Sequence, residues 1–444
     1  MPTKPDVVEP IDRAGRDALV ELRDLEVHFE LRGSALARLI GGASETVKAV
    51  DGVNLALRRG EVLGLVGESG SGKTTLGRAL LGLVRATGGH IEYRGRDLAR
   101  LPQRELRAIR RQLQMVFQDP HASLNPAMDL QTAIGHPLRI HKLVSGKAEE
   151  RARVVDALER VGLVPAEQFL TKLPTELSGG QKQRAVIARA IICSPELLVA
   201  DEPISMLDMS VRAKILELML ELKQDLELTY VYITHDLATA KFFCDRVAIM
   251  YLGRVVELGP TDQIFADPKH PYTRALLSAV PDPDPERRVP RDLPRGEIPD
   301  AAAPPHGCSF HPRCPRAFEP CGWEARDLRA MFERRWIRLG EEAYADEVGL
   351  ISGLDQVTPG QGEARLPMHS DQDAQRLAGL FETSRADEPD EPLWSGVEDV
   401  STDGHAVVVR FRPGIDPALL RTDGVEVACH LHDPSLNPPA DPGR

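Results

Sequence analysis

The stretch Gly67-Glu68-Ser69-Gly70-Ser71-Gly72-Lys73-Thr74-Thr75 decides the fold of this 444-residue chain. It matches the pattern G-x-x-x-x-G-K-[ST], and it follows the apolar run Val62–Val66 at the point where helical sequence begins. Such glycines let backbone N–H groups close around phosphates, and the helix start adds partial positive charge. The stretch therefore predicts a nucleotide site in which Lys73 reaches the β- and γ-phosphates and Thr74 ligates Mg²⁺.

Short apolar runs alternate with helical stretches around this motif. The alternation predicts a mostly parallel sheet wrapped by helices. Near-alternating apolar residues also predict two half-buried strands before the motif, with a loop insertion at residues 32–46 between them. The predicted strands are Val20–Leu31, Val53–Leu57, Val62–Val66, Leu197–Ala200 and Tyr230–Thr234, followed by a hairpin of Val247–Tyr251 and Arg254–Leu258.

The predicted strand Leu197–Ala200 runs directly into two carboxylates, Asp201 and Glu202. Asp201 suits the water shell of Mg²⁺, and Glu202 suits a base that orients or deprotonates an attacking water. Two acids at a strand end are, in isolation, often a helix cap or a surface turn. Their occurrence with a phosphate loop in one chain favours the catalytic interpretation.

The stretch Leu177-Ser178-Gly179-Gly180-Gln181 resembles the signature motif of ATP-binding-cassette (ABC) ATPases, and Ser178 lies 23 residues before Asp201. A serine and two glycine amides at a helix start form a second anion-binding site. The resemblance implies that this site faces the γ-phosphate held by another subunit, so that two subunits enclose two ATP molecules.

Further stretches resemble the remaining motifs of the ABC family. Gln118, in Val116-Phe-Gln-Asp-Pro, resembles the glutamine that contacts Mg²⁺ and the attacking water. His235 resembles the switch histidine that touches the γ-phosphate, and Ser205–Asp208 resembles the D-loop with its aspartate Asp208. The resemblance assigns the aromatic residue that stacks on adenine to Phe29, for which an inward-facing strand position is the alternative.

The resemblance implies an α/β fold: an ABC-type P-loop ATPase core with a helical subdomain, and a Pro-rich C-terminal extension carrying a small α+β insertion. Within the extension we predict a helix over Trp323–Tyr344, weak structure over residues 355–400, and strands at Ala406–Phe411 and Val425–His430. The predicted divisions are a disordered lead-in (1–17), the ATPase domain (18–265, helical subdomain about 119–177), an oligopeptide-transporter-type segment (266–321) and an acidic extension (322–444).

Charge and composition exclude several classes of protein. The net charge is −12; residues 281–444 carry 18 basic and 31 acidic side chains, whereas residues 1–280 carry 37 and 36. An acidic tail on a neutral body argues against nucleic-acid binding, which needs a basic stripe. No apolar run approaches the roughly 18–20 residues that cross a bilayer, and charges near the N-terminus argue against a signal peptide.

The spacing and number of the motifs favour transport among ABC functions. Only 104 residues separate Lys73 from Ser178, too few for the coiled-coil insertions of repair and chromosome proteins, and translation factors carry two cassettes where this chain has one. Val47–Val53, Phe117–Pro126 and Phe265–Val280 resemble oligopeptide/dipeptide uptake ATPases. Nickel importers and some sugar importers share the last of these stretches.

The resemblance implies an ATP-hydrolysing subunit that powers import of oligopeptides or dipeptides from the cytoplasmic face of the cell membrane, where it is peripheral. Its implied partners are two membrane-spanning permease subunits, a second ABC ATPase subunit that is usually a different polypeptide, and an extracytoplasmic solute-binding protein. Nucleic acid is not among them. The alternatives are an importer of nickel or another solute, an exporter ATPase, and a soluble ABC ATPase without a transport role.

Three of the six cysteines, Cys308, Cys314 and Cys321, lie within fourteen residues of a Pro-rich stretch. This crowding indicates a metal or cluster site rather than a disulfide framework. With Cys429 they supply the four thiolates of an iron–sulfur cluster, predicted as [4Fe–4S], and the resemblance supports this choice because some peptide-importer ATPases carry one. Zinc is the main alternative, with His306, His311 and His430 nearby, and an unmetallated thiol cluster is the other.

Overall fold

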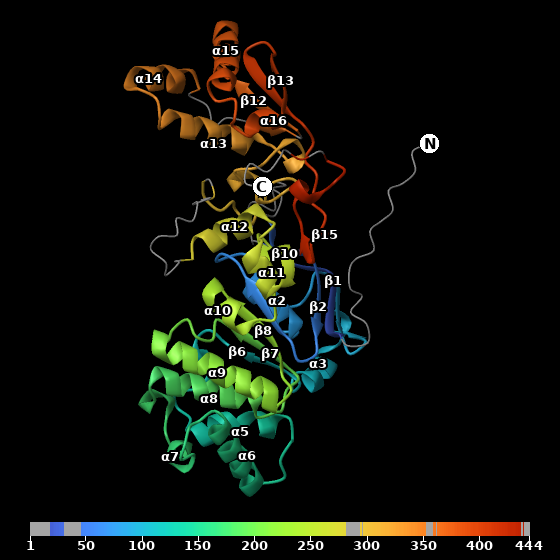
Figure 1. Ribbon diagram of the computed structural model, residues 1–444, viewed down its shortest axis with the longest axis vertical. Coiled ribbons are helices and arrows are strands. Elements are labelled where there is room, and N and C mark those ends of the chain that lie inside the picture. The colour runs from blue at the N-terminus through green and yellow to red at the C-terminus, as the bar shows by residue number, and fades with distance from the viewer. Residues whose placement is uncertain are drawn as a thin grey trace, which may run out of the picture. The chain divides into compact units, whose positions relative to one another are not determined.

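The computed structural model describes residues 18–30, 46–280, 294, 296–351, 358–360, 362–436 and 438, and it divides the chain into two compact units, 1–267 and 268–444 (Figure 1). The predicted lead-in at residues 1–17 lies outside the described residues. So does the predicted loop insertion at residues 32–46, apart from Thr46, which begins a strand.

The first unit is built on a central sheet with the strand order β10-β9-β3-β8-β7-β6. Neighbouring strands from β9 to β6 are parallel, and only β10 runs antiparallel to its neighbour. Every residue of β3, β7 and β8 is buried, which explains why these strands read as continuous apolar runs. The strands are β3 (Val62–Val66), β6 (Leu113–Val116), β7 (Leu197–Asp201), β8 (Thr229–Thr234), β9 (Arg246–Tyr251) and β10 (Arg254–Pro260).

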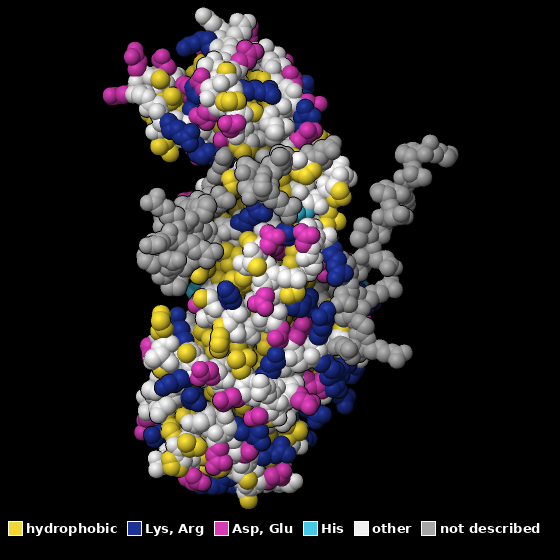
Figure 2. Space-filling model, viewed as in Figure 1, with side chains coloured by type: hydrophobic (Ala, Val, Ile, Leu, Met, Phe, Trp, Pro, Cys, Tyr) yellow, Lys and Arg dark blue, Asp and Glu magenta, His cyan; other side chains and the backbone are white. Residues whose placement is uncertain are grey.

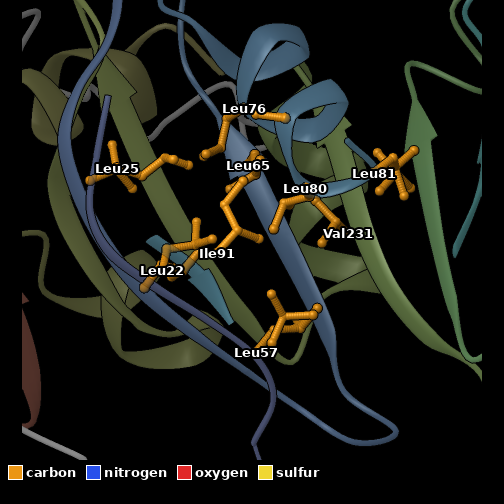
Figure 3. Packing of buried hydrophobic residues seen from close by; sticks show 14 of the residues in the cluster. Leu22, Leu25, Leu57, Leu65, Leu76, Leu80, Leu81, Ile91 and Val231 are labelled. Atoms are coloured by element: carbon orange, nitrogen blue, oxygen red, sulfur yellow. The ribbon is translucent and has the colours of Figure 1, made fainter. Parts of the chain in front are cut away.

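A second sheet of this unit is antiparallel, with the order β2-β1-β4-β5. It shares one hydrophobic core with helix α2 and the central sheet, and Figure 3 shows Leu22, Leu25, Leu65, Leu76 and Leu80 from these elements packed together. This core fixes α2 between the two sheets. The strands are β1 (Ala18–Glu30), β2 (Thr46–Arg58), β4 (Gly88–Tyr93) and β5 (Arg96–Asp97).

Helices cover the central sheet and form a helical segment between β6 and β7 (Figure 1). In that segment α5, α6 and α8 pack against one another. The helices of the first unit are α2 (Lys73–Leu80), α3 (Gln103–Ile109), α4 (Pro120–Ser123), α5 (Leu130–Ile140), α6 (Lys147–Arg160), α7 (Glu167–Leu170), α8 (Gly179–Ile191), α9 (Met209–Asp225), α10 (Leu237–Phe243) and α11 (Thr261–Ala266). The predicted α/β class is confirmed.

The first helix of the second unit is α12 (Pro271–Ser278), and short 3₁₀ turns follow at His311–Arg313 and Glu319–Cys321. It then forms an antiparallel sheet, β11-β12-β14-β13, on which helix α15 packs. Its other elements are α13 (Ala325–Trp336), α14 (Glu341–Leu350), β11 (Thr358–Gly360), β12 (Glu363–Pro367), α15 (Asp371–Asp387), α16 (Leu393–Gly396), β13 (Val397–Thr402), β14 (Ala406–Phe411), β15 (Leu420–Thr422) and β16 (Val425–Val427).

The prediction of weak structure over residues 355–400 was wrong, because this stretch holds the longest helix of the second unit, α15. Ala374, Leu377 and Phe381 are buried along one face of α15, and the Ser370 side chain caps its start by accepting from the Asp373 backbone N–H. The apolar positions are few in an acidic sequence, but their spacing is helical. The single helix predicted over Trp323–Tyr344 is instead two helices, interrupted before Gly340.

Among the described residues, no helix combines the length and apolar character that crossing a bilayer requires.

Two glycines of the second unit give opposite predictions for stability. A Cβ at Gly396 would lie 1.9 Å from the ring of Trp323, a buried side chain, whereas a Cβ at Gly379 in the middle of α15 meets nothing within 4 Å. We expect Gly396→Ala to cost about 1–3 kcal/mol through overpacking and Gly379→Ala to add about 0.5–1 kcal/mol through helix propensity. Denaturant unfolding measures both, and equal effects of the two variants would contradict the packing described here.

Candidate functional site

The phosphate-binding loop, residues 67–72, connects the buried strand β3 to helix α2. Gly72 has φ of 100°, and a Cβ there would lie 2.1 Å from the carbonyl oxygen of Ala49 in β2. A Cβ at Gly67 would lie 2.2 Å from the carbonyl oxygen of Met250 in β9. Both positions therefore exclude any side chain, and the loop is held close to the backbone of two strands.

The Lys73 ammonium lies inside this loop. Its Nζ donates to the carbonyl oxygens of Gly67 (2.8 Å) and Glu68 (2.7 Å) and to Ser71 Oγ (3.2 Å). Burial lowers the pKa of Lys73, although nearby carboxylates, Glu202 foremost, act in the opposite direction. The loop therefore already holds a cation where the sequence predicts the phosphates. Of the other loop residues predicted to bind ATP, Ser69 and Gly70 are exposed, and Thr75 is half-buried on α2.

Thr74 and Asp201 form a pair between α2 and the end of β7. Thr74 Oγ1 donates to Asp201 Oδ1 over 2.9 Å. Asp201 is 2% exposed; burial raises the pKa of its carboxyl group, and the Thr74 hydrogen bond lowers it. A hydroxyl and a carboxylate held together supply the hard oxygen ligands that Mg²⁺ prefers, so these residues fit the predicted ion.

Glu202 lies between two groups that come from distant parts of the sequence. Gln118 Nε2 donates to Glu202 Oε2 over 3.0 Å, and His235 Nδ1 lies 2.9 Å from Glu202 Oε1. The Glu202 backbone has φ of 47° and donates its N–H to the Ile233 carbonyl over 2.9 Å. This left-handed conformation is uncommon for a residue with a side chain and is typical of functional sites.

Ser178 caps the N-terminus of α8, where its Oγ accepts from the Gln181 N–H while Gln181 Oε1 accepts from the Ser178 N–H. The adjacent glycines border the start of α9. A Cβ at Gly179 would lie 3.5 Å from Leu207, and one at Gly180 would lie 2.8 Å from Val211. The signature motif is thus packed on the D-loop segment, whose exposed Asp208 caps α9 by accepting from the Val211 N–H.

Phe29 lies near the end of β1, opposite Val47 of β2, and its side chain is 44% exposed. The alternative of an inward-facing strand residue does not describe this position. Val47 is two residues from Ala49, whose carbonyl packs on the phosphate loop. An exposed ring on the strand next to the one that borders the loop suits stacking on a base.

Sequence reasoning did not single out Ala49, Met250 or Gly253, although all three border the phosphate loop. Ala49 and Met250 act through backbone carbonyls, and Gly253 donates its N–H to the Ser71 carbonyl over 3.0 Å. Backbone contacts leave no pattern in side-chain identity, so no sequence signal could have identified them.

The four cysteines predicted to hold an iron–sulfur cluster, Cys308, Cys314, Cys321 and Cys429, are all buried in the second unit. Cys308 N–H donates to the Cys321 carbonyl over 2.8 Å, which joins the two ends of the Pro-rich loop. The pKa of the Cys314 thiol is raised well above its usual value, first by burial and then by the neighbouring Cys308 and Cys429. The thiols are therefore near enough to interact electrostatically.

These thiols do not form a recognisable metal centre. In the part of the chain that the structure describes, no group of three or more His, Cys, Asp or Glu side chains has an arrangement that could hold a metal ion. The prediction of an iron–sulfur cluster is therefore not supported by the geometry. His311, one of the alternative zinc ligands, instead lies with Nδ1 2.8 Å from the Cys308 carbonyl and Nε2 3.1 Å from the Asp327 carboxylate.

Comparison with known proteins agrees with the motifs. The family described as ABC transporter matches residues 50–205, and the family described as oligopeptide/dipeptide transporter, C-terminal region, matches residues 256–321. The oligopeptide transport ATP-binding protein OppF of Escherichia coli is 47% identical over 69% of this chain and 91% of its own length. The chain belongs to the oligopeptide/dipeptide group of ABC transporter ATP-binding proteins.

Relatives from other bacteria show the same extent of similarity. A putative peptide import ATP-binding protein of Brucella ovis is 45% identical over 70% of this chain and 94% of its own length. The putative oligopeptide transport ATP-binding protein YkfD of Bacillus subtilis is 44% identical over 72% and 94%. These relatives are matched over nearly their full length, whereas more than a quarter of this ABC protein lies outside each match.

The two anion-binding elements predict different mutant phenotypes. Lys73→Ala removes the cation from the phosphate loop, so we expect ATP binding to this chain to weaken about 10- to 100-fold. Ser178→Ala removes the hydroxyl that caps α8 at the signature motif and leaves the phosphate loop untouched, so ATP binding to this chain should be retained while hydrolysis in the assembled protein falls. Equilibrium binding of a fluorescent ATP analogue measures the first effect, and phosphate release measures the second.

Asp129→Ala is the matched control for Ser178→Ala, because Asp129 caps α5 in the same way, accepting from the Thr132 N–H over 2.8 Å. Each cap is worth about 1 kcal/mol of helix stability. Equal loss of hydrolysis in the two cap variants would show that Ser178 acts only through its helix.

Proposed function

We propose that this chain is the ATP-hydrolysing subunit of an ABC transporter that imports oligopeptides or dipeptides. One observation carries the ATPase part of the proposal: the Glu202 carboxylate is held between Gln118 and His235, and the adjacent Asp201 is bonded to Thr74. A base, a metal-binding pair and the phosphate loop thus lie at the ends of neighbouring parallel strands. The peptide part rests on the names of the relatives and on the C-terminal family match.

The proposed reaction is attack of water on the γ-phosphorus of ATP, which breaks the bond to the oxygen that bridges the β- and γ-phosphates and releases ADP and phosphate. Lys73 binds the β- and γ-phosphates as a point charge, and Phe29 stacks on the adenine. Glu202 orients the water and accepts its proton, while Gln118 and His235 hold the carboxylate in place. Thr74, Asp201 and Gln118 would hold Mg²⁺, which would neutralise the charge that develops on the phosphate oxygens.

The proposed partners follow from the motifs that this chain presents outward. Ser178, Gly179, Gly180 and Gln181, together with Asp208, complete an ATP site on a second ABC subunit, which we propose is a different polypeptide. Since the described residues include no membrane-crossing helix, two permease subunits provide the path across the membrane, with a solute-binding protein on the far side. The chain is then a peripheral component on the cytoplasmic face.

On the face shown in Figure 2, acidic and basic side chains are intermingled over the first unit. This pattern lacks the continuous basic stripe that nucleic-acid binding requires. The proposal that nucleic acid is not a partner rests on the net charge of −12.

Glu202→Gln tests the proposed chemistry. The amide keeps the shape of the side chain and removes the base, so we expect the assembled transporter to lose at least about 100-fold in ATP turnover while ATP binding is retained. Peptide uptake into vesicles should stop with it. Uptake of nickel but not of peptide by the unmodified transporter would refute the peptide assignment and leave the ATPase assignment in place.

Glu227→Gln is the control for this variant. Glu227 also has a left-handed backbone, with φ of 52°, but it precedes β8 and so lies at the opposite end of the parallel strands. It should retain parental turnover. Parental turnover in Glu202→Gln as well would contradict the assignment of the base.

We also propose that Cys308, Cys314, Cys321 and Cys429 bind a metal centre, with [4Fe–4S] favoured over zinc. The described thiols are not arranged around a metal ion, but all four are buried in one unit, and Cys308 and Cys429 lie near enough to contribute to the raised pKa of Cys314 and of Cys321. Thiolates are the ligands of such clusters, so this proximity supports the proposal. When bound, the centre would cross-link the Pro-rich loop to the chain that precedes the C-terminus. Its role would be structural.

Anaerobic purification followed by iron, sulfide and zinc analysis tests this proposal. We expect about four iron and four sulfide per chain, with a broad visible absorbance that Cys321→Ser abolishes. Cys193→Ser, a buried thiol of the first unit, should leave the absorbance unchanged. A colourless protein with stoichiometric zinc, or with no metal, would rule out the iron–sulfur centre.

A further inference from the structure

One side chain outside every recognised motif holds the turn between Glu202 and Asp208. Arg212 is the fourth residue of α9 and is half-buried. Its Nε donates to the Leu207 carbonyl over 2.8 Å, and its Nη2 donates to the Ser205 carbonyl over 3.4 Å. A planar guanidinium presents several N–H donors in a fixed geometry, so this one residue fastens two carbonyls of a non-helical segment.

The same turn is bonded to Glu202. The Ser205 Oγ and the Ser205 backbone N–H donate to the Glu202 carbonyl over 3.0 Å and 3.2 Å. Because φ of Glu202 is 47°, its backbone conformation is intrinsically unfavourable and has to be stabilised by the surroundings. Contacts to its N–H from Ile233 and to its carbonyl from Ser205 supply that stabilisation.

The turn also borders the signature motif of the same chain. Leu207 is 8% exposed, and its side chain packs against Gly179. Val211, the residue before Arg212, packs against Gly180. Arg212 therefore donates a hydrogen bond to the backbone carbonyl of Leu207, and the Leu207 side chain packs against Gly179 of the signature motif. A continuous set of contacts runs from Glu202 through Ser205, Arg212 and Leu207 to Gly179.

We infer that Arg212 is a positioning residue for ATP hydrolysis. By fixing the turn, it keeps the Glu202 carboxylate aligned between Gln118 and His235, and it fixes the position of the signature motif relative to that carboxylate. Arg212 acts through backbone carbonyls of the turn and through Ser205. The inference rests on the proposed ATPase function.

The test compares Arg212→Met, Arg212→Lys and Lys214→Met in the assembled transporter. Methionine keeps much of the volume and loses all donors; lysine keeps the charge and can reach one carbonyl. Lys214 is an exposed cation on the same helix and serves as the control. We expect Arg212→Met to lower kcat about tenfold or more, because small misplacements of a catalytic group have effects of this size.

The KM for ATP and the unfolding temperature separate positioning from a general structural role. Since the phosphate loop is untouched, KM should stay within about twofold of the parental value, Arg212→Lys should recover part of kcat, and Lys214→Met should resemble the parent. Loss of thermal stability in both Arg212 variants, with kcat falling in proportion, would overturn the inference. So would a parental kcat in Arg212→Met.

Two further variants keep the outcome interpretable. Ser205→Ala removes only the hydroxyl that bonds the Glu202 carbonyl, and it should lower kcat about threefold at unchanged KM even if Arg212→Met does not fold. Glu202→Gln is measured in the same assay. If it retains parental turnover, the proposed function fails; if it is inactive while Arg212→Met and Ser205→Ala hydrolyse ATP normally, only the present inference fails.

Discussion

The candidate site depends on the parallel register of three strands. Val66 of β3 is opposite Thr234 of β8, and Asp201 of β7 is opposite Ile233. The residues that follow, Gly67, Glu202 and His235, therefore emerge at the same ends of the strands, where His235 Nδ1 lies 2.9 Å from the Glu202 carboxylate. Because side chains alternate between the faces of a strand, a slip of one residue in either pair would turn the carboxylate or the imidazole away.

This dependence explains how much the sequence could predict. The parallel strands are short and apolar throughout, and each leads into chemically distinctive residues, so both the elements and the meeting of Lys73, Asp201 and Glu202 were predictable. Gln118 and His235 were assigned through resemblance to a family, since a single glutamine or histidine after a strand carries little information. The structure adds what that assignment lacked: both side chains lie within 3.0 Å of the same carboxylate.

The second unit was predicted less well, for a different physical reason. Its helix α15 has only three apolar side chains buried along seventeen residues, and in an acidic sequence this narrow stripe resembles a solvated segment. Tertiary contacts with β13 and β14 stabilise it, and contacts of that kind cannot be read from local composition. By contrast, β14 has five buried residues of six, and its bounds, Ala406–Phe411, were predicted correctly.

Backbone atoms account for the part of the site that sequence patterns could not reveal. The Met250 and Ala49 carbonyls restrict positions 67 and 72 of the phosphate loop to glycine. The Glu202, Ser205 and Leu207 carbonyls accept the hydrogen bonds that hold the turn after Glu202. Motifs record the side chains that meet a ligand, whereas these carbonyls are present whatever the residue. A side chain that donates to backbone carbonyls, such as Arg212, can have any residue type as its partner, so no sequence motif records the contact. Arg212 is identified from its contacts in the structure. Those contacts connect the turn after Glu202 with Leu207, which packs on the signature motif.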